Sequence, residues 1–290
     1  MIELAPKHKY GLPLATPLMP ASGVFGFGDA YRDLIDLALL GAVVTNPISL
    51  RPRRAARGQR IQTRGDTFVV HTGWPNPGLH KVVRDYRDVW SHLPVPVIVH
   101  LLATQPTEVA ESVGYLSSIA NVAAVELGYA TQATTRRAVD CMAAAQEGTL
   151  PVIAQIPLER MAAWAPRFAN HGADALTLTA PPRAVLPISN EGLDSPVAHY
   201  MRGRLYGRAL FPLLLNVLSR WSDKLALPII ACGGIGSPQD ALDCLTLGAT
   251  AVQIDALLWK DPPLLNRVGH KLRQRRPAPT ADGESSTNPL

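Results

Sequence analysis

Eight short apolar segments constrain the fold of this 290-residue chain more than any other feature. They are TPLMPA, GAVVT, VPVIVHLL, VAAVEL, PVIAQI, ADALTL, LPIIAC and TAVQI. Segments with helical spacing of apolar residues lie between them, for example residues 29–40, 106–120, 134–146 and 204–221. Eight strand-helix units in about 260 residues predict an α/β fold, a closed (β/α)8 TIM barrel. A doubly wound open sheet is the alternative, but no GxGxxG motif follows the first strand.

The composition is consistent with one large domain. An apolar fraction of 47% suffices for a sizeable core, and we expect a single barrel over residues 1–272. The final segment, RRPAPTADGESSTNPL, is rich in Pro, Ser, Thr and Gly, so residues 273–290 are expected to form a disordered tail.

Charge and cysteine content narrow the functional class. No apolar run reaches the roughly 18 residues that span a bilayer, and the first ten residues lack a signal-peptide core, which predicts a soluble cytoplasmic protein. The three cysteines show no metal-binding spacing, so reduced thiols are expected. The net charge of +5 is concentrated in an arginine-rich loop between Arg51 and Arg64. No aromatic residues alternate with these arginines in a nucleic-acid motif, so a solvated loop is favoured over nucleic-acid binding.

Two connections are much longer than the few residues usual in such barrels. They cover residues 46–78, after the second strand, and residues 179–203, after the sixth. Loops at the carboxyl ends of barrel strands build the functional site, so both are predicted to cover it.

The segment 227–258 contains half of a phosphate site. Gly233 and Gly234 follow the seventh strand, where glycines let an anion approach backbone N–H groups. Asp255 and Ala256 follow the eighth strand, where a bare glycine is usual in such sites. Gln253 and Asp255 share strand parity, so if Gln253 faces the barrel lumen, Asp255 does too. Asp255 could pair with Arg204 or Arg208, or it could cap a helix after the strand.

Five segments together resemble the dihydroorotate dehydrogenase family, over residues 12 to about 262. The matching segments are TPLMPASGVFGFGDAY (16–31), GAVVTN (41–46), GWPNPG (73–78), LPIIACGGI (227–235) and GATAVQI (248–254). The resemblance implies a barrel that binds flavin mononucleotide (FMN) and oxidises dihydroorotate to orotate in pyrimidine synthesis. It also implies a homodimer and a small-molecule ligand in the barrel mouth.

Part of the family's site is retained. The resemblance implies that flavin contacts come from Ala21, Ser22, Gly23, Gly207, Gly233 and Gly234. It assigns substrate binding to Asn76, whereas the asparagine that starts the same motif in the family is replaced by Val70.

Other positions of that site carry different residue types. Asn46 and Gln155 stand where the family has lysines, and His100 stands where strand 3 commonly ends in Asn. Asp255 and Ala256 replace the phosphate-binding glycine and its hydroxyl neighbour. Thr131 occupies the position of the catalytic base, and losing a positioned base typically costs about 10²–10⁴ in rate. Gly128, Ala180 and Pro181 replace substrate donors.

These replacements predict a family member whose ordinary dihydroorotate oxidation is absent or severely impaired. A working FMN oxidoreductase, on dihydroorotate or another substrate, is one alternative. A non-catalytic scaffold or partner subunit is the other. His71 and His100 could form a new acid/base or metal pair, but no third ligand stands in register, so no metal site is expected.

Overall fold

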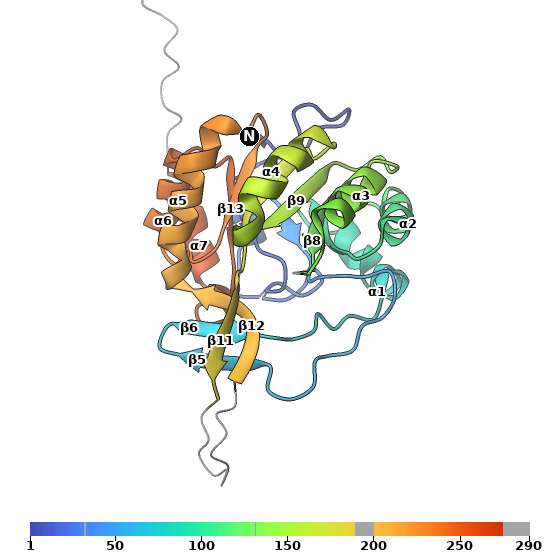
Figure 1. Ribbon diagram of the computed structural model, residues 1–290. Helices are drawn as coiled ribbons and strands as arrows, with labels where there is room; N and C mark the ends of the chain where they lie inside the picture. The colour runs from blue at the N-terminus through green and yellow to red at the C-terminus, as the bar shows by residue number, and fades with distance from the viewer. Residues whose placement is uncertain (32, 131, 189–199, 275–290) are drawn as a thin grey trace, which may run out of the picture.

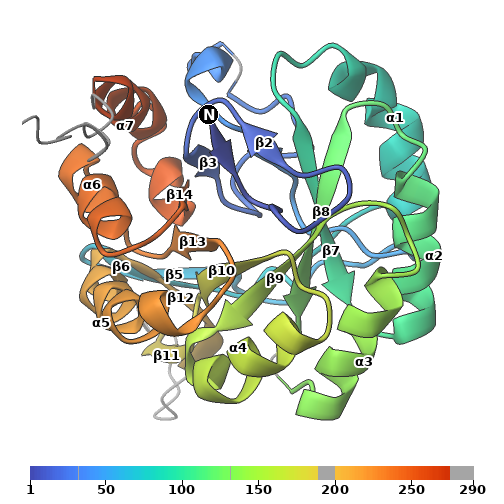
Figure 2. The same ribbon diagram turned by 90° about the horizontal axis from the view of Figure 1, so that it is seen from above.

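An eight-stranded parallel sheet, rolled into a nearly closed barrel and surrounded by helices, forms the centre of the protein (Figures 1 and 2). The computed structural model describes residues 1–31, 33–130, 132–188 and 200–274. The strand order is β3-β14-β13-β10-β9-β8-β7-β4. The strands are β3 (Leu18–Pro20), β4 (Val43–Val44), β7 (Val97–Ala103), β8 (Val122–Tyr129), β9 (Val152–Pro157), β10 (Ala175–Ala180), β13 (Ile229–Cys232) and β14 (Ala251–Ile254). Each overlaps one of the eight apolar segments, and the predicted (β/α)8 fold is confirmed.

The barrel closes where the first and second of these strands meet. Gly41, just before β4, donates its N–H to the carbonyl of Leu18 in β3 at 2.7 Å. A Cβ at position 41 would lie closer than 3.0 Å to the Thr16 carbonyl oxygen, so this approach requires glycine.

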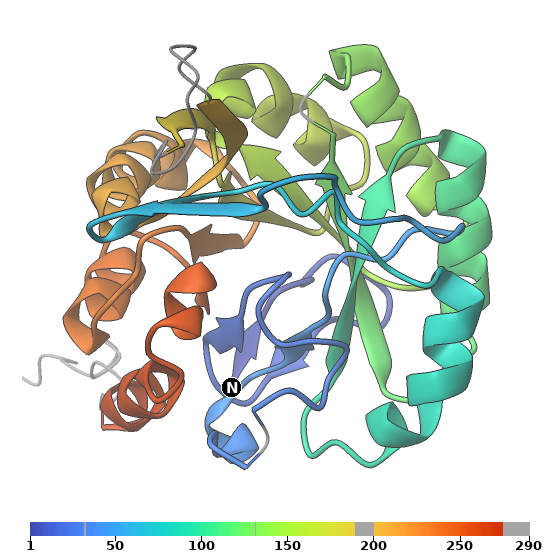
Figure 3. The ribbon, with the colours of Figure 1, turned by 90° about the horizontal axis from the view of Figure 1, so that it is seen from below.

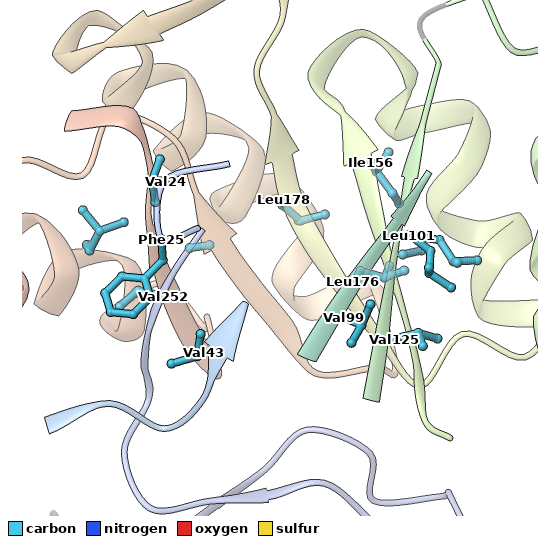
Figure 4. Close-up of a cluster of buried hydrophobic side chains, with 14 of the residues drawn as sticks. Val24, Phe25, Val43, Val99, Leu101, Val125, Ile156, Leu176, Leu178 and Val252 are labelled. Carbon is cyan, nitrogen blue, oxygen red and sulfur yellow. The ribbon is translucent and has the colours of Figure 1, made fainter. Parts of the chain in front are cut away.

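In the described ranges, seven α-helices cover the outside of the barrel. They are α1 (Leu79–Ser91), α2 (Pro106–Leu116), α3 (Thr135–Ala145), α4 (Met161–Asn170), α5 (Phe211–Trp221), α6 (Pro238–Thr246) and α7 (Leu264–Arg273). Strand residues such as Val99, Val125 and Leu176 belong to the core cluster shown in Figure 4. Alternate residues such as Ile98 and Ala124 belong to a second cluster, inside the barrel.

Two of the expected helices differ from the structure. Residues 29–40 form turns and one short 3-10 helix, Leu37–Leu39, among the described positions. Tyr31 adopts a positive φ of 61°, which is incompatible with an α-helix. The segment expected to be helical from residue 204 is strand as far as Gly207, and α5 begins only at Phe211. The expected tail lies outside the described residues from position 275 onward, and α7 extends to Arg273.

A second, antiparallel sheet lies across the carboxyl ends of the barrel strands (Figures 1 and 3). Its strands come from the two long connections and are β5 (Ile61–Arg64), β6 (Thr67–Val70), β11 (Arg183–Pro187) and β12 (Tyr200–Gly207), in the order β11-β12-β6-β5. The central pair sets Arg204 opposite Val70 and Gly207 opposite Thr67. The two loops predicted to cover the site therefore pair with each other.

The opposite end of the barrel is filled by apolar side chains. A hairpin of β1 (Ile2–Glu3) and β2 (Pro13–Leu14) places Leu4, Leu12 and Leu14 in the same buried cluster as the inward-facing strand residues. A ligand that reaches the lumen must therefore enter from the end with the second sheet. Within the described part of the chain, no helix has the length and apolar character needed to cross a bilayer.

Candidate ligand site at the barrel mouth

A buried polar cluster fills the middle of the lumen, beyond the apolar layer. The Glu126 carboxylate from β8 lies at its centre, with Oε1 2.7 Å from Nδ1 of His100 on β7. Its Oε2 accepts hydrogen bonds from Thr177 Oγ1 at 2.6 Å and from Gln253 Nε2 at 2.9 Å. All four residues are buried, with His100 only 3% exposed. Gln253 therefore faces the barrel lumen.

The charge state of Glu126 follows from these contacts. Burial alone would raise its pKa, but the hydrogen bond and charge of His100, with the donors on Thr177 and Gln253, hold the pKa below its usual range. An ionised carboxylate can only accept hydrogen bonds, so Nδ1 of His100 carries a proton. Nε2 is then the nitrogen with an available lone pair in the neutral ring.

His100 and Gly128 share the space at the end of β8. A Cβ at position 128 would lie closer than 3.0 Å to Nε2 of His100. The histidine ring therefore occupies the volume that a side chain at position 128 would need. The residues at these two positions are coupled by packing.

Two connected hollows lie above the polar cluster. The inner one is a small cavity of about 50 Å³ with His100, Gly128 and Gln155 in its lining. The outer one is a cleft of about 490 Å³ between the barrel mouth and the second sheet. Ser22, Pro47, Trp74, Arg204 and Tyr206 line both. A ligand lying in the cleft can therefore place one end in the inner cavity.

Asp255 occupies the corner predicted to hold half of a phosphate site. Its Oδ2 accepts from the N–H of Gly234 at 3.1 Å, and its Oδ1 accepts from the N–H of Leu257 at 3.2 Å. It caps the 3-10 helix Ala256–Trp259, so the helix-cap alternative is confirmed. The carboxylate is 2% exposed, and burial raises its pKa although both N–H groups act to lower it.

The arginines suggested as partners of Asp255 bond elsewhere. Arg204 donates to the Pro181 carbonyl at 2.7 Å. Arg208 donates to the Gly236 carbonyl at 3.0 Å and lies 3.5 Å from the Asp240 carboxylate. Arg204 still lines both hollows and supplies a positive charge to the inner cavity.

The structure brings most of the predicted flavin-site residues to these hollows. Ala21, Ser22, His100, Gln155 and Asp255 line the inner cavity, and Ser22, Gly23 and Asn46 line the cleft. Gly207 and Gly234 lie against each other behind this lining, since a Cβ at position 234 would meet the Gly207 carbonyl oxygen at 3.0 Å. Ala256 is fully buried, and Gly233 has a positive φ of 129°. The predicted base, Thr131, lies outside the described residues.

The side chain of Asn76, which was predicted to bind substrate, forms hydrogen bonds within its own loop. Its Oδ1 accepts from the N–H of Gly78 at 3.0 Å, and its Nδ2 donates to Ser49 Oγ and to the Trp74 carbonyl, each at 3.1 Å. It does not line either hollow in the described structure.

His71 and His100 are placed differently. His71 is exposed at the edge of the cleft, whereas His100 is buried against Glu126. Over the residues that the structure describes, no three His, Cys, Asp or Glu side chains are grouped closely enough to hold a metal ion. Cys232 lines the inner cavity, but burial raises the pKa of its thiol well above the usual range.

Glu126 and Thr177 are the members of the polar cluster that the sequence interpretation did not identify. Strand parity carried the necessary signal, because Glu126 alternates with Ala124 and Gly128 and therefore faces inward. A carboxylate in the middle of an apolar strand requires partners, and only the barrel geometry identifies them.

Comparisons with known proteins converge on one family. The family model described as dihydroorotate dehydrogenase matches residues 6–129 and 188–275. A protein of Pelobacter propionicus named dihydroorotate dehydrogenase B (NAD(+)), catalytic subunit, is 30% identical over 281 residues, covering 91% of this chain and 90% of its own length. Proteins with the same name from Desulforudis audaxviator and Geobacter sulfurreducens are 30% and 28% identical, with the same coverage. The unmatched segment, residues 130–187, contains Thr131, Gln155, Ala180 and Pro181.

Proposed function

Because this chain belongs to the dihydroorotate dehydrogenase family, we propose that it is a ligand-binding barrel in which ordinary FMN-dependent oxidation of dihydroorotate is absent or severely impaired. The family uses FMN, and a flavin needs a site for its phosphate. The observation that carries the proposal is the position of the Asp255 carboxylate, which accepts the N–H groups of Gly234 and Leu257.

The residues in this corner do not fit a phosphate. Both N–H groups donate to Asp255, so neither is available to an anion. An ionised carboxylate about 4 Å from a phosphate is repelled by roughly 4 kcal/mol per unit charge at an effective dielectric near 20. That repulsion corresponds to about three orders of magnitude in affinity.

The charge partners expected for a flavin ring are also replaced. Asn46 and Gln155, at the positions where the resemblance implies lysines, are both near the hollows but carry no charge. The absence of charge at these two positions is a second reason, separate from Asp255, to expect loss of the ordinary reaction.

Two alternatives have support of their own. A working FMN oxidoreductase is supported by the retained Ala21, Ser22 and Gly23 and by the cleft, whose volume lies in the usual range for small-molecule sites, about 300–1,000 Å³. A non-catalytic partner subunit is supported by the relatives, which are named as catalytic subunits and so belong to larger assemblies. Homodimer formation remains a prediction from the family.

Titration with FMN tests the proposal. We expect the purified protein to be colourless and to bind FMN weakly, whereas Asp255→Gly should bind it on the order of 10³-fold more tightly because both N–H groups become available. Asp240→Asn is the matched control, since Asp240 is also a buried carboxylate that accepts a main-chain N–H, from Gly236 at 2.9 Å. Bound flavin in the wild-type protein, with turnover of dihydroorotate, would overturn the proposal.

A further inference from the structure

The inner cavity has an acid/base pair at its floor that neither the family resemblance nor the relatives assign. We propose that His100 and Glu126 form a proton-transfer dyad, which acts without flavin on a small carboxylate that Arg204 holds in the cavity. This role goes beyond the proposed loss of dihydroorotate oxidation and does not depend on whether FMN binds.

The hydrogen bonds of Glu126 orient the histidine for this role. Thr177 and Gln253 both donate to Oε2, which leaves Oε1 for His100 Nδ1 at 2.7 Å. This arrangement keeps the proton on Nδ1 and the lone pair on Nε2 in the neutral ring. When Nε2 takes up a proton, the carboxylate stabilises the resulting imidazolium. Glu126 is therefore a positioning residue, and His100 is the group that exchanges the proton.

The glycine at position 128 places Nε2 at the cavity. The ring lies in the space next to the Gly128 Cα, and both residues line the cavity. Among the described residues, no hydrogen-bond partner is seen for Nε2, whereas Nδ1 has Glu126. A ligand atom in the cavity can therefore approach the available nitrogen directly.

Arg204 determines the chemical class of the ligand. Its guanidinium has five donors, and within the described structure it uses one hydrogen bond, to the Pro181 carbonyl. It lines the inner cavity with His100, so a carboxylate bound to Arg204 would keep the rest of a small molecule near Nε2. The other titratable groups facing this cavity are Tyr129, Tyr206, Cys232 and Asp255.

The chemistry is a balanced proton exchange. Nε2 takes a proton from a carbon next to a carbonyl group, and the electron pair of the C–H bond moves to form the enolate. The imidazolium then returns a proton to the same carbon, which restores the carbonyl group and the neutral ring of His100. No electrons leave the ligand, so the step needs no oxidant, and Gln155 supplies an amide donor to the same cavity.

Hydrogen exchange in D₂O provides the test, with dihydroorotate as the probe because it has a carboxylate and a CH₂ group next to a ring carbonyl. Proton NMR of flavin-free protein should show loss of the CH₂ signal faster than in buffer. His100→Gln should slow the exchange by about 10²-fold or more. His270→Gln is the control, because His270 is an exposed histidine on α7 that lines neither hollow, and it should exchange like the wild type.

Two further variants separate the roles within the site. Arg204→Gln should raise the probe concentration needed for half-maximal exchange at least about tenfold, with little effect on the maximal rate. Glu126→Gln should lower the maximal exchange rate with little effect on the probe concentration for half-maximal exchange, because His100 loses the carboxylate that orients its ring. Exchange at the buffer rate in the wild type, or equal rates in the wild type and folded His100→Gln, would overturn the proposal. Exchange is measured on flavin-free protein, so this result and FMN binding by the Asp255 variants are read separately.

Discussion

Gly128 and His100 depend on one another, because the histidine ring occupies the space next to the glycine Cα. Neither replacement can be understood separately. A side chain at position 128 would displace the ring, and displacing the ring would leave the buried Glu126 carboxylate without its hydrogen bond from His100. A buried charge without a partner is strongly unfavourable. The residue types at positions 100 and 128 are therefore coupled through packing and through the hydrogen bond to Glu126.

Gly128→Ala tests this coupling. We expect the variant to lose about 2–4 kcal/mol of unfolding free energy, because the added methyl group separates His100 from Glu126. Urea denaturation measures the loss. Gly114→Ala, in α2, is the control, since no atom lies within 4 Å of its added Cβ, and it should be neutral or slightly stabilising. Equal stability of the two variants would show that His100 moves aside without cost.

The second sheet is the element that turns the barrel mouth into an enclosed cleft. It joins β6 to β12, strands separated by about 130 residues of sequence, and β12 carries Arg204 to the cleft. The pairing requires a close approach at Gly203, where a Cβ would lie closer than 3.0 Å to the Val70 carbonyl oxygen. The position of the cavity's positive charge therefore depends on contacts between two loops.

Gly203→Ala should weaken this sheet without unfolding the barrel. Its methyl group would force β12 away from β6, so amides in β6 and β12 should exchange with deuterium at least about tenfold faster. Hydrogen-exchange mass spectrometry would locate the change. Gly65→Ala, in the turn between β5 and β6, has no atom within 4 Å of the added Cβ and should have a smaller effect, from its positive φ alone. Faster exchange throughout the barrel strands would contradict a local role for Gly203.

The sequence predicted the elements of the barrel more successfully than the contacts between them. The apolar segments correspond to the eight strands because burial on both faces leaves a clear local pattern. The parity of Gln253 and Asp255 was also local, and their lumen-facing positions agree with it. Pairing of the two long loops depends on distant segments, and β12 was interpreted as the start of a helix. Partners of Glu126 come from three other strands and were not visible in any one motif.

The whole molecule has one closed end and one functional end. The β1–β2 hairpin and its leucines fill the first, and the second sheet covers the other above the cleft (Figures 2 and 3). Between them lies the buried polar cluster centred on Glu126. Because this cluster connects β7, β8, β10 and β14, its protonation affects the stability of the entire barrel.

The free energy of unfolding should therefore depend on pH through the protonation of Glu126. The pKa of Glu126 is lowered in the folded protein, so its stabilising contribution is present above the unfolded pKa of about 4.3 and is lost as the pH falls through the folded value. Glu126→Gln should cost about 3–5 kcal/mol at neutral pH, because the buried hydrogen bonds of the carboxylate with His100, Thr177 and Gln253 are disrupted. Its difference from the wild type should narrow below about pH 4.3. Asp255 acts in the opposite direction, since its raised pKa makes ionisation destabilising as the pH rises.

Urea unfolding of the wild type and Glu126→Gln between neutral and acidic pH gives the difference in unfolding free energy directly. Asp88→Asn, at an exposed site on α1, is the control and should follow the pH dependence of the wild type. A constant difference across the whole range would mean that the Glu126 carboxylate does not titrate differently in the folded and unfolded chains.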